Sequence, residues 1–515
     1  MLVAATWRDF ELDRFFVPKE LVLHVSAFAA GLLALRAIGR VRLRVADFLL
    51  VAYLALGIVS ALGATNGWVA VRSVALTASG LVVFWSARGL RLDGLSRSMI
   101  GAVALAVVLG CATSLLQTYG IRTDFFSLNR APGGTLGNRN FIAHMAAFGL
   151  PIVLLVALRA RSWVGWLLAG AGATLVAATL VLTRSRAGFL AMGGVVAVLF
   201  LALVLSPALR THGRAWRRTA GLVLLSVAGI AAVIALPNDL NWRSENPYLE
   251  SLTGVANFQE GSGRGRVVQY RHSLRIARDH PLLGAGPGNW GVVYADYAAD
   301  GDPSLDRSEP GRTANPWPSS DWIAFISERG FVATALLAVA LALIAIAATR
   351  DAMRTHDADD ALAATAIVAM IVATVIAGMF DAVLLLAQPM LLVWLAAGAL
   401  WPVGAPEAET LPQDEANGLR ETVRMAAVAG VIFIAGIGMV RSAAQLAGMG
   451  IYAHAETSRW LARAALIDPG SYELRIRLAR GSSGLARAER CRHALAARAL
   501  QPNAREARNL SSGCD

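Results

Sequence analysis

Long apolar segments, each about the length that a membrane-spanning helix needs, recur along most of this chain. A helix crosses the hydrocarbon core of a bilayer with roughly 20 apolar residues. Twelve segments approach that length: 20–39, 46–63, 69–87, 98–118, 141–158, 162–182, 188–206, 219–236, 322–348, 361–380, 382–402 and 424–444. The pattern therefore predicts an all-α polytopic membrane protein with about twelve transmembrane helices.

The apolar segments form two blocks on either side of a polar insertion. We expect an N-terminal transmembrane block over 1–236, with about eight helices, and a C-terminal block over 322–444, with about four. The insertion over 237–321 is predicted to be a large loop with an amphipathic helix. The tail over 450–515 is rich in Ala, Arg and Leu, and is predicted to be helical but not apolar enough to span. An acidic linker over 404–418 joins two spans of the second block and is expected to be solvated.

Composition supports the membrane class and indicates an orientation. Of the 515 residues, 56% are hydrophobic and 16% are charged, and the mean hydropathy is +0.54, which argues against a soluble protein. The net charge of +12 comes mostly from arginines beside the spans, so it indicates the positive-inside pattern and no nucleic-acid partner. If the twelve spans alternate, the arginine-bearing short loops share one side, which we assign to the cytoplasm: 40–44, 88–97, 159–161, 210–218 and 350–354.

The same alternation puts the insertion, the loop 119–140 and both termini on the opposite side. In a bacterium this side is the periplasm, so we expect a multi-pass protein of the inner membrane whose active site faces the periplasm. Cys491 and Cys514 lie in the tail and could pair in an oxidising compartment. Cys111 falls within a span and is expected to be inert.

A weak internal repeat occurs in the tail. The segment RAALIDPGSYELR (463–475) matches AARALQPNAREAR (496–508) at an offset of 33 residues. A period near 34 with a Pro-containing turn resembles tetratricopeptide helical hairpins, although an ordinary amphipathic helical hairpin would also fit. Two partial repeats are too few for a free-standing solenoid, so we expect the tail to dock on another surface, which could belong to a protein partner.

Residues 264–279 of the insertion favour a helix that lies on the membrane surface. One stripe at helical spacing consists of Val267, Tyr270, Leu274 and Ala277, and the adjoining face carries Arg271, Arg275 and Arg278. Such a helix could place its arginines on lipid headgroups, or it could bind a diphosphate at the membrane surface. The glycines that follow, including Gly286 and Gly288, could offer backbone amides to a phosphate or could simply end the helix.

Other polar side chains lie at span boundaries on the same predicted side. Arg184 and Arg186 occupy a tight turn between two spans and could converge on the same anion, or they could snorkel to the interface. Asp321 and Glu328, seven residues apart, share a helix face, so either could be a general base. Asp381 is either a cap or a functional carboxylate. No metal-ligand spacing, hydrolase elbow or dinucleotide fingerprint occurs in the sequence, and we expect neither a metal nor a cofactor.

Four motifs in order resemble the bacterial O-antigen ligase and O-antigen polymerase superfamily: Gly137-Asn138-Arg139-Asn140-Phe141, Thr183-Arg184-Ser185-Arg186-Ala187-Gly188, Gly265-Arg266, and the run Pro281 to Asn289, PLLGAGPGN. The resemblance covers roughly residues 130–400. It implies a C-type glycosyltransferase architecture, with a large periplasmic loop between late spans. It also implies transfer of a glycan from undecaprenyl diphosphate to a hydroxyl of a glycan, lipid or protein acceptor, without a metal.

By this resemblance, Arg186 and Arg266 would hold the diphosphate and stabilise its departing charge, which agrees with the chemistry of fixed guanidinium groups. Residues expected to join the diphosphate site are Arg139, Arg184, Arg264, Arg271, Gly286 and Gly288. The family commonly has a histidine where this chain has Ser319. The base is therefore left open among Asp321, Glu328 and a histidine from elsewhere: His144, His272 or His280.

Two other classes of function compete with glycan transfer. One is a transporter or flippase of a lipid-linked glycan, and the other is a non-catalytic scaffold of a polysaccharide assembly complex. A transporter should have pseudo-repeated halves and charged or broken spans near the middle of the bilayer. This chain instead concentrates its polar chemistry in one asymmetric insertion, which favours the transferase.

Overall fold

The architecture is known from a computed structural model that describes residues 2–514, except 39–40, 42, 128, 241, 243, 245, 255–258, 260, 300 and 402–415. Within these residues every regular element is helical, apart from an isolated bridge between Leu305 and Thr313. The predicted acidic linker falls almost wholly on 402–415 and so lies outside the described residues. The all-α fold class is confirmed.

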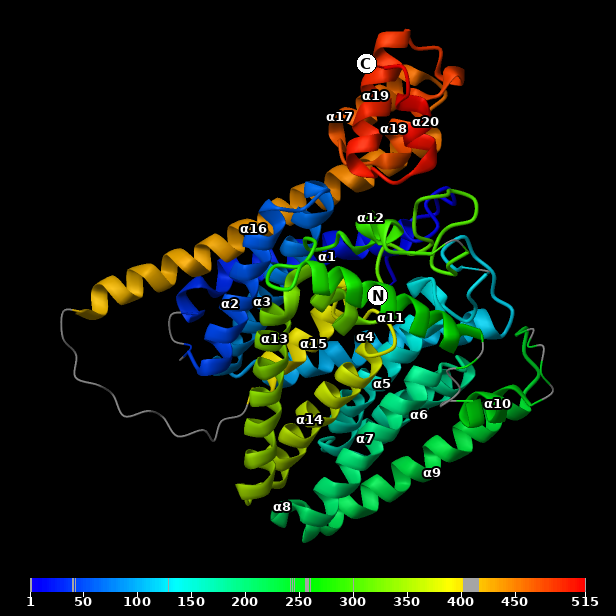
Figure 1. Ribbon diagram of the computed structural model, residues 1–515. Helices are drawn as coiled ribbons and strands as arrows, with labels where there is room; N and C mark the ends of the chain where they lie inside the picture. The colour runs from blue at the N-terminus through cyan, green and yellow to red at the C-terminus, as the bar shows by residue number, and fades with distance from the viewer. Residues whose placement is uncertain are drawn as a thin grey trace.

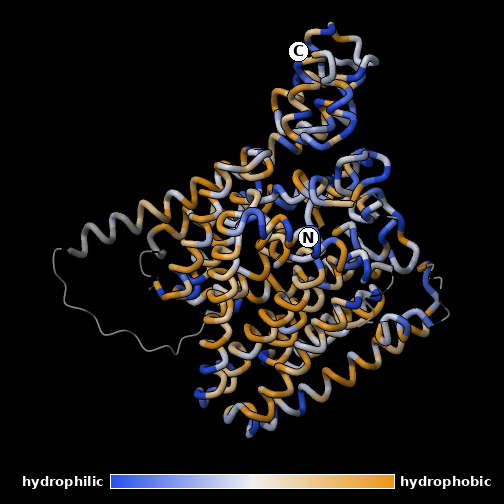
Figure 2. The backbone as a smooth tube through the Cα atoms, viewed as in Figure 1, coloured by the Kyte–Doolittle hydropathy of each residue, from blue (hydrophilic) through white to orange (hydrophobic). Residues whose placement is uncertain are grey.

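Eleven helices of the described chain are long and apolar enough to cross a membrane. They are α1 (Asp13–Ile38), α2 (Val45–Leu62), α3 (Gly67–Leu92), α4 (Ser96–Thr118), α5 (Arg139–Leu158), α6 (Trp163–Leu182), α7 (Arg186–Leu205), α9 (Gly213–Ala235), α13 (Asp321–Arg354), α14 (Ala358–Gly378) and α16 (Ala416–His454). These helices form one bundle, shown in Figure 1, whose middle is apolar in Figure 2.

The predicted span at 382–402 is wrong as a full crossing. Helix α15 (Ala387–Ala399) has 13 residues, which at about 1.5 Å per residue is much shorter than the roughly 30 Å hydrocarbon core. The apolar residues before it form an irregular loop instead, because the amides of Val383 and Leu384 donate to the carboxylate of Asp321. The buried carboxylate of Asp321 thus binds backbone amides of a segment that its apolar composition had predicted to be helical.

The centre of the bundle consists of α3, α5, α14 and α15. Of the 18-residue apolar window of α5, 83% is buried, against 6% for α9. Helix α9 lies at the outside against α6 (Figure 1). Helix α5, which carries the first motif, is therefore an inner helix, whereas α9 offers nearly all of its surface to the surroundings.

Helix α13 is broken at Gly330, whose φ of 79° and ψ of 173° are not helical. A side chain at this left-handed position would be strained. The amide of Phe331, freed by the break, donates to the carbonyl of Pro281 at 2.9 Å. The expected straight span over 322–348 is thus two half-helices, and a turn of the insertion is seated at their junction.

The insertion covers one end of the bundle, which we call the α11 end. It contains α10 (Pro247–Thr253), α11 (Gly261–Asp279), α12 (Trp290–Val293) and the short η3 (Tyr294–Asp296); η1 (Gly134–Leu136) precedes α5. At the opposite end, α8 (Pro207–Arg210) lies beside the end of α13, because Ser206 Oγ donates to the Ala352 carbonyl at 2.7 Å. The arginines of loops 88–97, 159–161, 210–218 and 350–354 are grouped at this opposite end.

The tail beyond α16 folds as two helical hairpins. The first pairs α17 (Ser458–Ile467) with α18 (Tyr472–Ala479), and the second, after η4 (Gly481–Ser483), pairs α19 (Arg487–Leu500) with α20 (Arg505–Ser511). Each copy of the sequence repeat spans the turn of one hairpin, which explains the offset. A disulfide joins Cys491 to Cys514.

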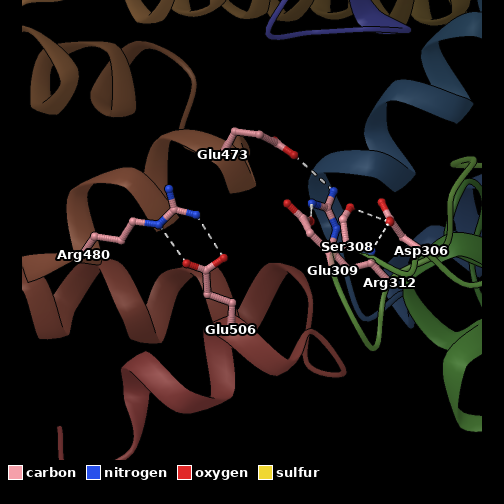
Figure 3. Close-up of polar contacts among 7 residues, drawn as sticks. All are labelled: Asp306, Ser308, Glu309, Arg312, Glu473, Arg480 and Glu506. Carbon is pink, nitrogen blue, oxygen red and sulfur yellow. Dashed lines mark hydrogen bonds and ion pairs between the residues drawn. The ribbon is translucent and has the colours of Figure 1, made fainter. Parts of the chain in front are cut away.

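The surface on which the tail docks is the insertion of the same chain. Arg312 contacts Glu473 at 3.1 Å and also pairs with its neighbour Glu309, as Figure 3 shows. Asn503 Nδ2 donates to Asp296 at 2.9 Å, and the amide of Arg505 donates to the Pro310 carbonyl at 2.8 Å. The tail is thereby fixed at the α11 end of the bundle.

Candidate functional site

Helix α11 is held against the start of α13 and the end of α14 by two of its side chains, Tyr270 and Gln269. The Tyr270 hydroxyl lies 2.6 Å from the Ser319 carbonyl and 2.8 Å from the Met379 carbonyl, and its one proton is shared between these two acceptors. The amide of Ser319 donates to Gln269 Oε1 at 2.6 Å. Burial raises the pKa of Tyr270 to about 12, although the nearby charge of Arg266 opposes the shift. The hydroxyl therefore stays protonated and continues to donate at neutral pH.

The apolar stripe of α11 is only partly covered by the rest of the described chain. Val267 and Leu274 are 42% and 45% exposed. The face that packs against the rest of the insertion is more polar and consists of Gln269, His272, Ser273, Ile276 and Ala277. Its polar members find partners there, as in the 2.8 Å bond from Trp290 Nε1 to Ser273 Oγ. Hydrophobic periodicity missed this face because hydrogen-bonded polar side chains can be buried.

Arg266 lies one helical turn before Tyr270, so the two side chains share a face of α11. It is half-buried, and within the described chain its guanidinium forms neither a hydrogen bond nor an ion pair. Its charge acts on Tyr270 and on His144 of α5. Arg266 is thus a positioned cation without a protein counterion among those residues.

Asp381, in the loop between α14 and α15, is the carboxylate that acts on the same two side chains. Its Oδ2 accepts from Asn140 Nδ2 at 3.2 Å and its Oδ1 from the amide of Ala382 at 2.9 Å. The side chain is partly exposed. His144 is buried beside it, and neither of its ring nitrogens has a hydrogen-bond partner in the described chain. A cation, a carboxylate and an imidazole are therefore gathered under α11.

Asp321, the first candidate base, is enclosed and already bonded. It is 1% exposed, and its carboxylate accepts the amides of Val383, Leu384 and Leu385 at 2.9, 2.8 and 3.3 Å. Its own amide donates to the Asp381 carbonyl. The carboxylate closes the α14–α15 loop onto the first turn of α13 and leaves no open side to a substrate.

Glu328 plays a similar part for the glycine turn. It is 1% exposed, and its carboxylate accepts the amides of Gly288 at 2.8 Å and Trp290 at 3.2 Å. The amide of Gly286 donates to the Glu328 carbonyl at 3.0 Å. The amides expected to cradle a phosphate are thus bonded to α13, and we leave Gly286 and Gly288 out of the proposed anion site.

The glycines of this turn are needed for close packing. Gly286 and Gly288 have φ values of 102° and 71°, in the region that favours glycine. A Cβ atom would lie 2.5 Å from Ala64 Cβ at Gly286 and 2.7 Å from Val69 Cγ1 at Gly288. The turn is therefore wedged between α13 and the start of α3.

A second cluster of cations is formed where α6 meets α7. Arg184 has a φ of 54°, the one positive value at a non-glycine residue in the described chain, and its side chain contacts Ser251 at 3.0 Å and Glu250 at 3.1 Å. Its guanidinium lies 4.7 Å from the centre of a Trp242 ring, and that of Arg139 lies 5.0 Å from a ring centre of the same residue. This unusual backbone is the kind that persists at functional sites.

Arg186 begins α7 directly after this turn and is half-buried. A Cβ atom on Gly254 would lie 2.9 Å from its Nη2, so the end of α10 is against it. Two residues further along, Gly188 packs on Ala143, the residue before His144. The start of α7, which contains Arg186, therefore packs on the part of α5 that carries His144.

The remaining sequence candidates lie elsewhere. His272 is bonded to Asp302 at 2.8 Å, and Tyr294 donates to the same carboxylate at 2.9 Å, so this histidine belongs to the buried interior of the insertion. His280, Arg264 and Arg271 are exposed. Among the residues that the structure describes, no three His, Cys, Asp or Glu side chains gather in a way that could hold a metal ion.

Several participants carried no usable signal in the sequence. Trp242, Asp302 and Tyr294 belong to no motif, and their roles depend on contacts between distant segments. Asn140 lies in one of the four motifs, but only the fold brings it to Asp381.

Comparison with known proteins identifies one family. A family model described as O-antigen ligase matches residues 171–338, a range that contains the α6–α7 turn, the whole insertion and the first half of α13. This match confirms the resemblance to the O-antigen ligase and polymerase superfamily, and it implies a lipid-linked glycan as substrate. No curated protein matches the chain.

Proposed function

We propose that this protein is a membrane glycosyltransferase of surface polysaccharide assembly, since residues 171–338 match the O-antigen ligase family model. It transfers a glycan from undecaprenyl diphosphate to an acceptor hydroxyl at the periplasmic face. The observation that carries the proposal is Arg266, a half-buried guanidinium with no ion-pair partner in the described chain, whose charge acts on the same two side chains, Tyr270 and His144, as the partly exposed carboxylate of Asp381.

In this mechanism Arg266 and Arg186 bind the diphosphate. When the glycosidic bond to the donor phosphate breaks, negative charge develops on the departing diphosphate. Guanidinium groups fixed beforehand by α11 and α7 stabilise that charge without reorganisation, and they can do so without a metal ion. Arg184 and Arg139, which flank Trp242, form the outer rim of the same anion site.

The proposed base is Asp381 in place of Asp321. A base must reach the hydroxyl of the acceptor, and Asp381 is partly exposed, whereas Asp321 is enclosed by three backbone amides. Glu328 and His272 are each committed to a buried partner. His144 has unbonded ring nitrogens but is 1% exposed, so it is the second choice.

The disulfide supports a periplasmic position for the site. Bonds of this kind persist in oxidising compartments, and the tail that contains Cys491 and Cys514 docks on the insertion through Asn503 and Glu473. The arginine-bearing loops are grouped at the other end, as the positive-inside rule requires of a cytoplasmic face. Together these features favour a bacterial inner-membrane protein whose α11 end faces the periplasm.

A transfer assay in detergent solution tests the proposal against its competitors. Purified full-length protein would be incubated with a polyprenyl-diphosphate-linked glycan and an acceptor, and the products would be separated by mass. Neither a flippase nor a scaffold gives a transfer product in this assay. A flippase moves its substrate between the two leaflets of a bilayer, which a detergent micelle lacks, and a scaffold forms no covalent bond. Product formation by the wild-type protein, absent with Arg266→Ala, is the expected result. No product with any lipid-linked glycan of the host would overturn the proposal.

The lipid-linked glycans of a deletion strain then decide between the two forms of the reaction. Accumulation of single repeat units indicates a polymerase, and accumulation of long chains indicates a ligase. Attachment to protein is the third possibility, since the helical tail offers a surface that could recruit a protein acceptor. Glycan released from the lipid-linked pool and from protein would each be sized by gel electrophoresis.

A further inference from the structure

A second polar site lies at the end of the bundle opposite α11. A cavity of ≈ 810 Å³ is open there between the ends of five spans and α15. Its charged lining comes from the ends of α3, α4, α5, α13 and α14: Arg91, Arg97, Arg159, Arg354, Asp351, Asp359 and Asp360. Its apolar lining includes Ala363, Leu400 and Trp401. No motif of the sequence falls in this cavity, and the proposed glycan transfer does not use it.

The charges of the cavity are only partly paired with one another. Asp359 lies 3.5 Å from Arg97 and 3.6 Å from Arg159 and so occupies both. By contrast, the side chains of Arg91, Arg354 and Asp360 form no hydrogen bond or ion pair within the described chain. The cavity therefore presents two available cations and one available anion.

We propose that this cavity binds the zwitterionic headgroup of a phospholipid that carries a primary amine. The phosphodiester lies between Arg91 and Arg354, since guanidinium groups form strong charge-assisted hydrogen bonds to phosphate oxygens. The ammonium group lies at Asp360. The apolar wall at Leu400 and Trp401 receives the glycerol and the first carbons of the chains. The inference does not depend on the proposed function.

Two features favour a zwitterion on a lipid. Four arginines and three aspartates line the cavity, so a purely anionic headgroup would leave Asp360 facing a ligand of its own sign. The cavity also lies where the apolar spans end, as at Leu92 of α3 and Arg354 of α13, which is the level of lipid headgroups in a bilayer. A free phosphoester has no acyl chains that could contact the apolar wall at Leu400 and Trp401.

Native mass spectrometry of the purified full-length protein tests the proposal. The protein would be titrated with phosphatidylethanolamine, phosphatidylglycerol and phosphatidylcholine, and the bound lipid would be counted. We expect the wild-type protein to bind phosphatidylethanolamine about tenfold more tightly than the other two, as one charge-assisted hydrogen bond allows. Equal binding of all three lipids would overturn the proposal.

Variants assign the effect to the cavity. Asp360→Asn, an exposed position, should remove the preference for the primary amine while all three lipids still bind. The double variant Arg91→Gln/Arg354→Gln should lose all three. The matched control Arg214→Gln/Arg217→Gln, at exposed arginines of α9 on the same end, should behave as wild type. Should the cavity variant and this control bind lipid alike, the assignment would be wrong.

A competition experiment distinguishes a lipid from a soluble ligand of the same chemistry. Glycerophosphoethanolamine, which carries the headgroup without acyl chains, should fail to displace phosphatidylethanolamine even in large excess. Displacement at concentrations comparable to the lipid would reject the lipid as occupant. Thermal unfolding of each variant in lipid-free detergent verifies that loss of binding is not loss of fold.

Discussion

Two pairs of charged residues lie at the α11 end of the bundle, and their surroundings differ. Asp321 and Glu328 on α13 are each 1% exposed, and their carboxylates accept backbone amides from other segments. Arg266 and Asp381 are partly exposed and are not enclosed in this way. Both pairs lie at the same end of the bundle and both are ionisable. Proximity to the site therefore does not separate the charges that hold the fold from those available to a substrate.

The difference teaches that exposure is a better guide than the number of bonds, because Glu328 and Asp381 each accept two hydrogen bonds but only Asp381 is partly exposed. A buried carboxylate that accepts backbone amides ties loops to a helix: Asp321 holds the α14–α15 loop and Glu328 holds the glycine turn. A charge left with an open side can still bind or transfer a proton. The proposed mechanism therefore rests on the second pair, and each member of either pair can be tested by substitution.

The largest effect is expected from Asp381→Asn. Asparagine keeps one oxygen, which can retain the bond from either Asn140 or Ala382, and it cannot accept the proton of the acceptor hydroxyl. Loss of a general base lowers the rate by about 10²–10⁴-fold. The turnover of purified protein would be measured with saturating lipid-linked glycan, together with its melting temperature. A turnover within a few-fold of wild type would remove Asp381 from this role and turn attention to His144.

The next largest effect is expected from Arg266→Ala, a loss of about 10²–10³-fold in turnover, because one preorganised donor to the leaving group is removed. Arg266→Lys should recover part of the rate, since it keeps the charge but not the two-pronged geometry. The matched control is Arg275→Ala. Arg275 is exposed and lies nine positions further along, so it points to the opposite side of α11. Equal losses in Arg266→Ala and Arg275→Ala would mean that α11 acts through its total charge.

The contrasting prediction concerns stability. Asp321→Asn should destabilise the protein by about 1.5–3 kcal/mol, the usual worth of a hydrogen bond to a charged group. Its amide nitrogen would also face backbone donors. Turnover per folded molecule should stay within a few-fold of wild type, as judged by activity normalised to the folded fraction in a thermal-shift experiment. A stable but inactive Asp321→Asn protein would reverse the comparison and restore Asp321 as the base.

The sequence predicted those features that depend on composition over many residues. Apolar runs of sufficient length become spans because lipid leaves the backbone no other partners, and eleven of the twelve expected runs did so. The motif residues Arg266 and Arg186 were also recognisable in advance, although their role is still a proposal. What the sequence could not predict depends on single contacts between distant segments. The α15 run was shortened by Asp321, and the buried face of α11 is polar because Gln269 and His272 have partners in the insertion.

The smallest effect is expected where the tail meets the insertion, away from both pairs. Arg312 joins Glu473 across this contact, and its guanidinium lies 4.2 Å from the ring centre of Tyr472 (Figure 3 shows the ion pair). The side chains of Arg312 and Glu473 are 22% and 40% exposed. Arg312→Ala should therefore weaken docking of the tail by only about 0.2–1 kcal/mol.

Limited proteolysis between α16 and α17 would report that loosening, whereas turnover on a glycan acceptor should be unchanged. The matched control is Arg480→Ala, which removes the Arg480–Glu506 pair inside the tail and should leave the docking contact intact. If Arg312→Ala lowered turnover as much as Arg266→Ala does, the tail would be part of the catalytic apparatus. The charges that matter for transfer would then extend beyond the space beneath α11.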